Sequence, residues 1–172
     1  MLQMCRLPEQ QGTVSRLVFL TGTAKSIVAD INVDMFLPIV PLKILKILGM
    51  EESDLGTNAA KIAQSMGIKP IADPEPLRNA FIRSDQYSFI KKGVPAVKID
   101  VGFELGTPEQ KVFKEWLTNR YHAPSDDVNQ PVDLQAAATY EEFTRRLLIS
   151  TANDSAKPQW KPDSFFRRYA AD

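Results

Sequence analysis

The stretch SIVADINVDMF, residues 26–36, decides the fold class of this chain. Two sets of side chains alternate along it residue by residue, as in a β-strand whose two faces differ in polarity. One set is apolar and the other is largely polar: Ile27, Ala29, Ile31 and Val33 against Val28, Asp30, Asn32 and Asp34. The pattern predicts a strand with one face in the core and one face that is polar or directed into a site.

Strands and helices alternate on either side of this stretch. A Thr-Pro-Glu-Gln capping box at 107–110 predicts a helix, and Ser53 or Asp54, Ser84 and Asp133 are expected to cap others. Further strands are predicted over 14–20, 42–48 and 95–101, helices over 55–66, 84–93, 108–120 and 134–152, and a loop over 70–76. This order predicts an α/β fold with a partial, largely parallel or mixed sheet flanked by helices.

Three segments follow from these elements. We expect residues 1–13 to be a tail, 14–155 to be an incomplete α/β domain, and 156–172 to be an aromatic C-terminal tail packed on that domain.

Composition narrows the function classes. The 172 residues contain 21 Lys and Arg and 21 Asp and Glu, so the formal net charge is zero. A zero net charge argues against a nucleic-acid binder, which needs a basic face. No apolar run approaches the ~20 residues of a membrane span. Cys5 is the single cysteine, which rules out a disulfide within the chain. Residues 1–12 lack the pattern of a signal peptide, so we expect the chain as written to be cytoplasmic.

The only histidine, His122, lies in the stretch YHAPSDD, residues 121–127. Neutral imidazole is the commonest metal ligand, and a nearby carboxylate such as Asp126 commonly accepts the other ring N–H. In α/β sheets ligands bind beyond the carboxyl ends of the strands, where Asp34 and the Ser84-Asp85 pair are also expected. These residues predict a polar or metal-binding site.

Each residue also has an ordinary structural explanation. Asp34 can be a turn or cap carboxylate, His122 a polar loop residue, and Asp126-Asp127 the cap of the turn that leads to Asn129. Singly, none of these residues decides between a site and a loop.

In chain order, however, four fragments match a known pattern. They are NVDM at 32–35, RSDQYSF at 83–89, GVPA at 93–96 and RYHAPSDD at 120–127. Together they resemble the C-terminal half of the two-zinc aminopeptidases of metallopeptidase family twenty-eight. The resemblance extends from about Val14 to Tyr169.

The resemblance implies a zinc-dependent exopeptidase that removes N-terminal residues from peptides. In that family Asp34 matches a ligand of one zinc and His122 a ligand of the other, so each zinc has one ligand here. Ser84, Asp85, Tyr121 and Asp126 fall in supporting or cleft positions, and Gln86 stands where many relatives carry a supporting His. Intact relatives are often exported.

Important parts of the family pattern are missing. The family's general-base Glu belongs to a Thr-Gly-Glu-Glu motif, but Thr21-Gly22 runs directly into Thr23-Ala24-Lys25. The His-x-Asp motif and the bridging Asp are also absent. Glu51-Glu52 lies after Asp34, whereas the family's pair precedes that Asp. We therefore expect no catalytic residue, no stoichiometric zinc and no activity of the chain alone, as in a truncated or internally deleted form.

Two alternatives remain. The chain can be a non-catalytic module that binds peptides or another partner in the old cleft. It can also be a serine hydrolase that uses Ser84 or Ser88 with His122, although no Gly-x-Ser-x-Gly elbow is present. Expected partners are peptide N-termini and, through an unpaired sheet edge near 14–20, other copies of the chain.

Overall fold

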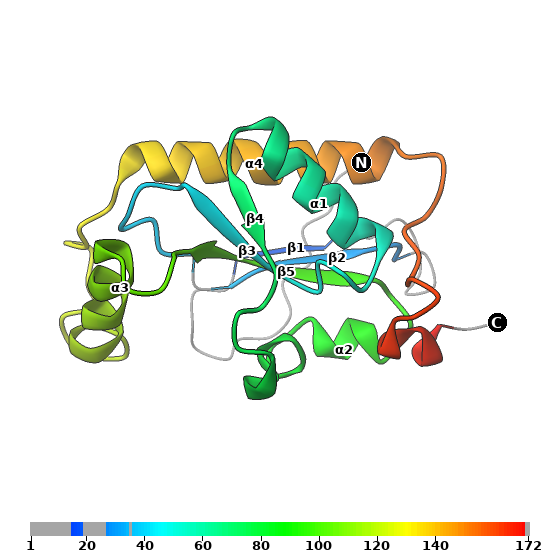
Figure 1. Cartoon of the computed structure of the whole chain (residues 1–172), viewed down its shortest axis with the longest axis horizontal. Coiled ribbons are helices and arrows are strands. Elements are labelled where there is room, and N and C mark those ends of the chain that lie inside the picture. The colour runs from blue at the N-terminus through cyan, green and yellow to red at the C-terminus, as the bar shows by residue number, and fades with distance from the viewer. Residues whose placement is uncertain (1–14, 19–26, 35, 171–172) are drawn as a thin grey trace.

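The computed structural model describes residues 15–18, 27–34 and 36–170. In this part of the chain strands alternate with helices, which confirms the predicted α/β class (Figure 1). The elements are β1 (Ser15–Val18), β2 (Asp30–Val33), β3 (Ile44–Leu48), α1 (Asp54–Ser65), β4 (Lys69–Ile71), η2 (Pro76–Arg78), η3 (Ala80–Ile82), α2 (Tyr87–Ile90), β5 (Ala96–Gly102), α3 (Pro108–Asn119), α4 (Leu134–Asn153) and η4 (Phe165–Tyr169).

The described strands form one mixed sheet in the order β1-β2-β5-β3-β4. The central pair β2 and β5 is parallel, and β3 runs antiparallel to β5. At the two margins β1 pairs antiparallel with β2, and β4 pairs parallel with β3. β2 and β5 therefore run in the same direction, but β2 ends beside the middle of β5, whereas the carboxyl end of β5 lies next to the start of β3.

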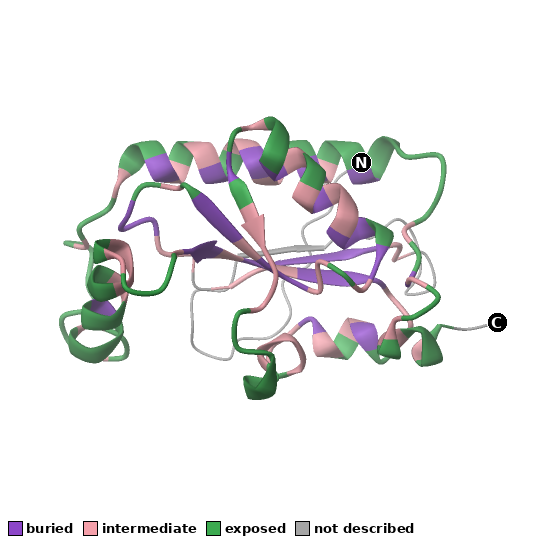
Figure 2. Ribbon diagram, viewed as in Figure 1, coloured by how far each residue is buried: buried purple, intermediate pink, exposed green. Residues whose placement is uncertain are grey.

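Helices α1 and α4 cover one face of the sheet, where the main core lies (Figures 1 and 2). Leu45, Ile47 and Ile99 point into this core and are fully buried. The hydroxyl of Tyr140 on α4 donates a hydrogen bond to the Ile99 carbonyl at 2.9 Å. Burial, and then the charge of Asp100, raise the pKa of Tyr140. The phenol therefore stays neutral and remains a donor.

The predicted caps explain where the long helices begin. Ser53 accepts from the Gly56 N–H at 3.3 Å, Thr107 from Gln110 at 3.4 Å, and Asp133 from Ala136 at 2.9 Å. Each side-chain oxygen satisfies one of the free N–H groups of a first helical turn. Helices α1, α3 and α4 thus confirm the predictions to within one or two residues.

Two local predictions are wrong. The helix expected over 84–93 is only the single turn of α2, and Ser84 does not cap it with its side chain. The loop expected over 70–76 begins with strand β4, which contains Pro70. Proline is tolerated there because β4 is the last strand of the described sheet, where an outward N–H is not needed. Of the strand predicted over 14–20, the structure describes β1; the remainder lies outside the described residues.

The C-terminal segment returns to the domain and packs beside α2 (Figure 1). Trp160 is 6% exposed, forms a bridge with Ser53, and donates from Nε1 to the Gly93 carbonyl at 3.0 Å. Gly93 has a φ of +82°, and a Cβ at this position would lie 2.6 Å from the Tyr169 carbonyl oxygen. The positive φ and the close approach of the Tyr169 carbonyl both require glycine just after α2.

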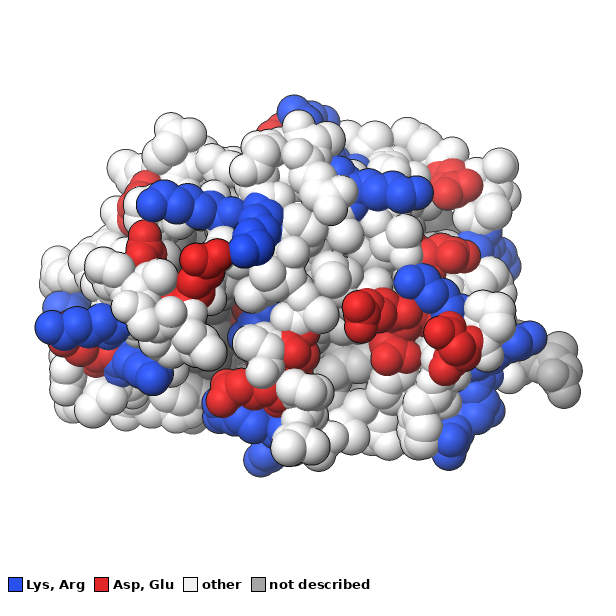
Figure 3. Space-filling model, in the orientation of Figure 1, with Lys and Arg blue, Asp and Glu red and all other residues white. Residues whose placement is uncertain are grey.

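Charged side chains of both signs are interspersed over the face seen in Figure 3, in keeping with their equal numbers in the sequence. None of the helices in the described part of the chain has the length and hydropathy of a membrane-spanning segment.

Candidate functional site

The face of the sheet opposite α1 and α4 is polar along β2. Ala29 and Ile31 belong to the core under the two helices, whereas Asp30 and Asn32 are directed to the other face. These two polar residues are 2% and 1% exposed. The alternation predicted from residues 26–36 is therefore confirmed over Ala29 to Asn32, but Val28, which was expected on the polar side, packs against the core.

Gln86 fastens the segment before α2 to this polar face. Its Oε1 accepts a hydrogen bond from Asn32 Nδ2 at 2.6 Å, and its Nε2 donates to the Phe81 carbonyl at 2.5 Å. The Gln86 side chain is fully buried. Because buried amides are costly to leave unpaired, these bonds fix the path of the segment that carries Ser84.

Asp34, directly after β2, lies at the end of this polar face with its side chain 28% exposed. Ser84 Oγ donates to Asp34 Oδ2 at 3.3 Å, and Lys98 Nζ lies 3.8 Å from the same oxygen. Thus the structure brings Asp34 and Ser84 together, as the sequence predicted, and adds an ammonium group that the prediction did not include.

Lys98 continues into a row of alternating charges across three strands. Its Nζ is 3.9 Å from Asp100, and Asp100 is 3.1 Å from Lys46 Nζ on β3. Lys98 and Asp100 are 14% and 17% exposed, so water screens their charges only in part. The row Lys46, Asp100, Lys98 and Asp34 has two positive and two negative members and is neutral as a whole.

This row bears on metal binding at Asp34. A divalent cation on the Asp34 carboxylate would lie close to the Lys98 ammonium, and like charges in a partly buried site repel. A catalytic zinc needs about three protein ligands. The described residues contain no group of three or more His, Cys, Asp or Glu side chains placed to hold a metal ion. The donor set that the structure describes does not fit a two-zinc centre.

His122 lies in the loop after α3, where it is exposed and has a φ of +57°. Its ring stacks on Tyr121, with centroids 3.9 Å apart and planes at 25°. The ring centroid of Tyr121 in turn lies 5.9 Å from that of Trp116. Trp116 donates from Nε1 to Gln130 at 2.8 Å, which closes the loop against α3. The imidazole is thus held by aromatic neighbours at the surface.

The other predicted residues have local partners. Asp126 accepts a hydrogen bond from Gln130 Nε2 at 3.1 Å, and its role toward His122 stays a prediction. Asp127 accepts from the Asn129 N–H at 2.8 Å, which is the turn-capping alternative for this carboxylate. The Asp85 carbonyl accepts from the Ser88 N–H at 3.1 Å at the start of α2.

Glu52 belongs to the Glu51-Glu52 pair, which resembles the family's missing Glu-Glu pair, but it has a structural partner. Its carboxylate accepts a hydrogen bond from Ser164 Oγ at 2.5 Å, and its carbonyl accepts from the Lys161 N–H. Glu52 therefore anchors the C-terminal segment beside the start of α1. The hydroxyl of Ser84, the nucleophile of the serine-hydrolase alternative, donates a hydrogen bond to Asp34.

The sequence of the chain was compared with models of known protein families. The model of peptidase family M28 matches residues 13–148, which is most of the chain. The chain belongs to peptidase family M28. The matched residues include both Asp34 and His122, and they end within α4, before the C-terminal segment. No curated protein and no solved structure matched.

The M28 resemblance alone did not reveal Lys98. A signal for it exists in the sequence, because Lys98 and Asp100 alternate with Val97, Ile99 and Val101 in the strand predicted over 95–101. Two charges of opposite sign on one face of an interior strand need partners on the neighbouring strands. Asp34 and Lys46 are those partners.

Proposed function

We propose that this M28 chain descends from a zinc-dependent aminopeptidase and that, by itself, it does not hydrolyse peptides. Asp34 and His122 occupy the positions of two family ligands, one for each zinc. Family membership supports the peptidase ancestry. The single histidine and the missing Glu-Glu motif support the lack of turnover, because catalysis needs several metal ligands and a general base.

One observation carries this proposal most strongly. The Asp34 carboxylate already has two partners from its own chain, the Ser84 hydroxyl and the Lys98 ammonium. An ammonium neutralises a carboxylate without accepting an electron pair from a substrate oxygen. A site arranged in this way keeps the shape of the strand end but lacks an electrophile.

An aminopeptidase assay tests the proposal. The purified chain is incubated with an aminoacyl-anilide, with and without added zinc, beside His122→Ala. We expect no release of the anilide above the level of the variant, since loss of a general base alone costs ~10²–10⁴-fold in rate. Zinc-dependent release that disappears in His122→Ala would show that the chain completes an active centre.

A peptide-binding module is the second candidate. The observation that favours it is the exposed pair of stacked rings, Tyr121 and His122; Tyr121 is 37% exposed. Exposed aromatic rings commonly anchor binding partners. Fluorescence polarisation with labelled peptides tests this function, and Tyr121→Ala should weaken binding if the rings form the surface. Equal binding by this variant would remove the rings from the proposal.

A further inference from the structure

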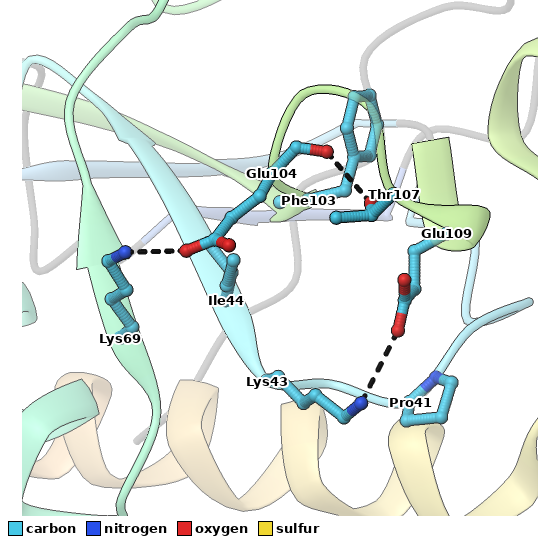
Figure 4. A pocket seen from close by; sticks show the side chains of 9 residues that line it. Pro41, Lys43, Ile44, Lys69, Phe103, Glu104, Thr107 and Glu109 are labelled. Atoms are coloured by element: carbon cyan, nitrogen blue, oxygen red, sulfur yellow. Dashed lines mark hydrogen bonds and ion pairs between the residues drawn. The ribbon is translucent and has the colours of Figure 1, made fainter. Parts of the chain in front are cut away.

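A cavity of about 330 Å³ opens beside the carboxyl end of β5, at the margin of the sheet formed by β3 and β4 (Figure 4). Its volume is at the lower limit of small-ligand pockets, which measure roughly 300–1,000 Å³. The residues that line it are Pro41, Lys43, Ile44, Lys69, Gly102, Phe103, Glu104, Thr107 and Glu109. Neither Asp34 nor His122 is among them.

The middle of the cavity is apolar. Ile44 is 8% exposed and pairs in the sheet with Gly102, where a Cβ would come within 2.6 Å of Ile44 Cγ2. The absence of a side chain at Gly102 therefore leaves the Ile44 side chain as part of the wall. Phe103 adds a second apolar surface and is supported by Phe113 of α3, with ring centroids 5.3 Å apart.

Two ion pairs flank this apolar centre. Lys69 Nζ lies 2.7 Å from Glu104, and Lys43 Nζ lies 3.3 Å from Glu109. Figure 4 shows one pair on each side of Ile44. A hydrogen bond from Lys69 lowers the pKa of Glu104, and bonds from its own backbone N–H and from Lys43 lower that of Glu109. Both carboxylates are therefore ionised at neutral pH.

These ion pairs can exchange partners with a ligand. The Lys69 and Glu104 side chains are 60% and 59% exposed, and an exposed ion pair contributes little to stability. The balance of two lysines and two glutamates disfavours a simple anion or cation, because each would meet a like charge. A molecule with one ammonium and one carboxylate complements the cavity.

We propose that this cavity binds a free α-amino acid with an apolar side chain. The carboxylate of the ligand would accept hydrogen bonds from Lys69, its ammonium group would donate to Glu104, and its side chain would contact Ile44 and Phe103. For a ligand of this size, we expect a dissociation constant on the order of 0.1–1 mM. The proposal does not depend on peptide hydrolysis, since the residues differ from those of the Asp34 and His122 site.

NMR titration of the full chain tests this site with three probes of similar shape. Leucine has both charges, leucinamide lacks the carboxylate, and 4-methylpentanoate lacks the ammonium. Leucine should shift the amide signals of Ile44, Lys69 and Phe103. The other two probes should bind about two- to fivefold more weakly, because each leaves one charged group of the protein without its partner.

Variants complete the test. Lys69→Met and Glu104→Gln should each weaken leucine binding by about two- to fivefold. Glu142→Gln is the control, since Glu142 is also an ion-paired glutamate, with its side chain 35% exposed, but lies on α4. It should leave leucine binding unchanged. Equal binding of the three probes, signal shifts confined to other residues, or no shifts at all would each overturn the proposal. None of these results bears on the aminopeptidase assay.

Discussion

Replacing Gln86 with leucine tests how the candidate site is held together. Gln86 is fully buried and joins β2 to the segment before α2 through Asn32 and the Phe81 carbonyl. Leucine has nearly the same size but cannot form either hydrogen bond. The variant therefore removes the bonds and leaves the packing largely intact.

The magnitude follows from the two partners that are left behind. A buried polar group without a hydrogen bond costs about 1–3 kcal/mol. Asn32 is 1% exposed, so the loss of its partner should cost an amount anywhere in this range. The Phe81 carbonyl is only part-buried, so its loss should cost an amount at the lower end of the range. We expect Gln86→Leu to lower the free energy of unfolding by about 2–4 kcal/mol.

Urea unfolding followed by circular dichroism measures this loss. Gln64→Leu, an exposed glutamine on α1, is the matched control and should stay within about 0.5 kcal/mol of the parent chain. The double variant Asn32→Leu with Gln86→Leu should lose less than the sum of its single changes, because neither site then holds an unpaired amide. A Gln86→Leu variant as stable as Gln64→Leu would refute this account of the buried bridge.

Three other perturbations probe the rest of the molecule. Hydrogen bonds from Arg145 and Arg146 lower the pKa of Glu142 from about 4.5 to about 2, so its stabilisation is present at neutral pH and is lost as the pH falls through this range. Glu142→Gln should then lower the melting temperature at neutral pH but not near pH 2, and an equal loss at both would contradict the assignment. Trp160→Ala should cost about 3–5 kcal/mol of unfolding free energy, because the ring is buried against α2 and bonded to Gly93; a loss below about 1 kcal/mol would show that the C-terminal segment contributes little. Strand β1 ends the described sheet, so sedimentation velocity should show association that grows with concentration, and a monomer at all concentrations would reject this edge as a contact.

Elements with local signals were predicted well from sequence. The Thr-Pro-Glu-Gln box specifies the start of α3 through bonds within one turn, and Asp133 does the same for α4. The alternation along residues 26–36 likewise identified the two faces of β2. In each case the residues that decide the structure lie within a few positions of one another.

Elements that depend on distant partners were predicted less well. Ser84 is a good cap in isolation, but its hydroxyl bonds to Asp34, fifty positions earlier in the chain. Strand β4 contains Pro70 and exists because β3 offers it an edge. The antiparallel direction of β3 against β5 also depends on the whole sheet, so local patterns could not reveal it.

The candidate site likewise has features that the sequence predicted and features that depend on distant partners. Its position at the end of β2 was predictable, because strand ends in α/β sheets collect polar groups. The row of charges from Lys46 to Asp34 was not predicted, since it requires knowing which strands are neighbours. Likewise, no local pattern predicted the left-handed backbone at His122 or the stacking of its ring on Tyr121.

Calorimetric titration with zinc decides most directly whether Asp34 and His122 hold metal in this chain. Because Asp34 is paired with Lys98 and the described donors do not fit a two-zinc centre, we predict no submicromolar binding and no effect of a chelator on the melting temperature. Asp34→Ala and His122→Ala, titrated in parallel, should behave like the parent chain. Submicromolar binding by the parent that is lost in both variants would contradict this prediction and show that the two residues form a metal site.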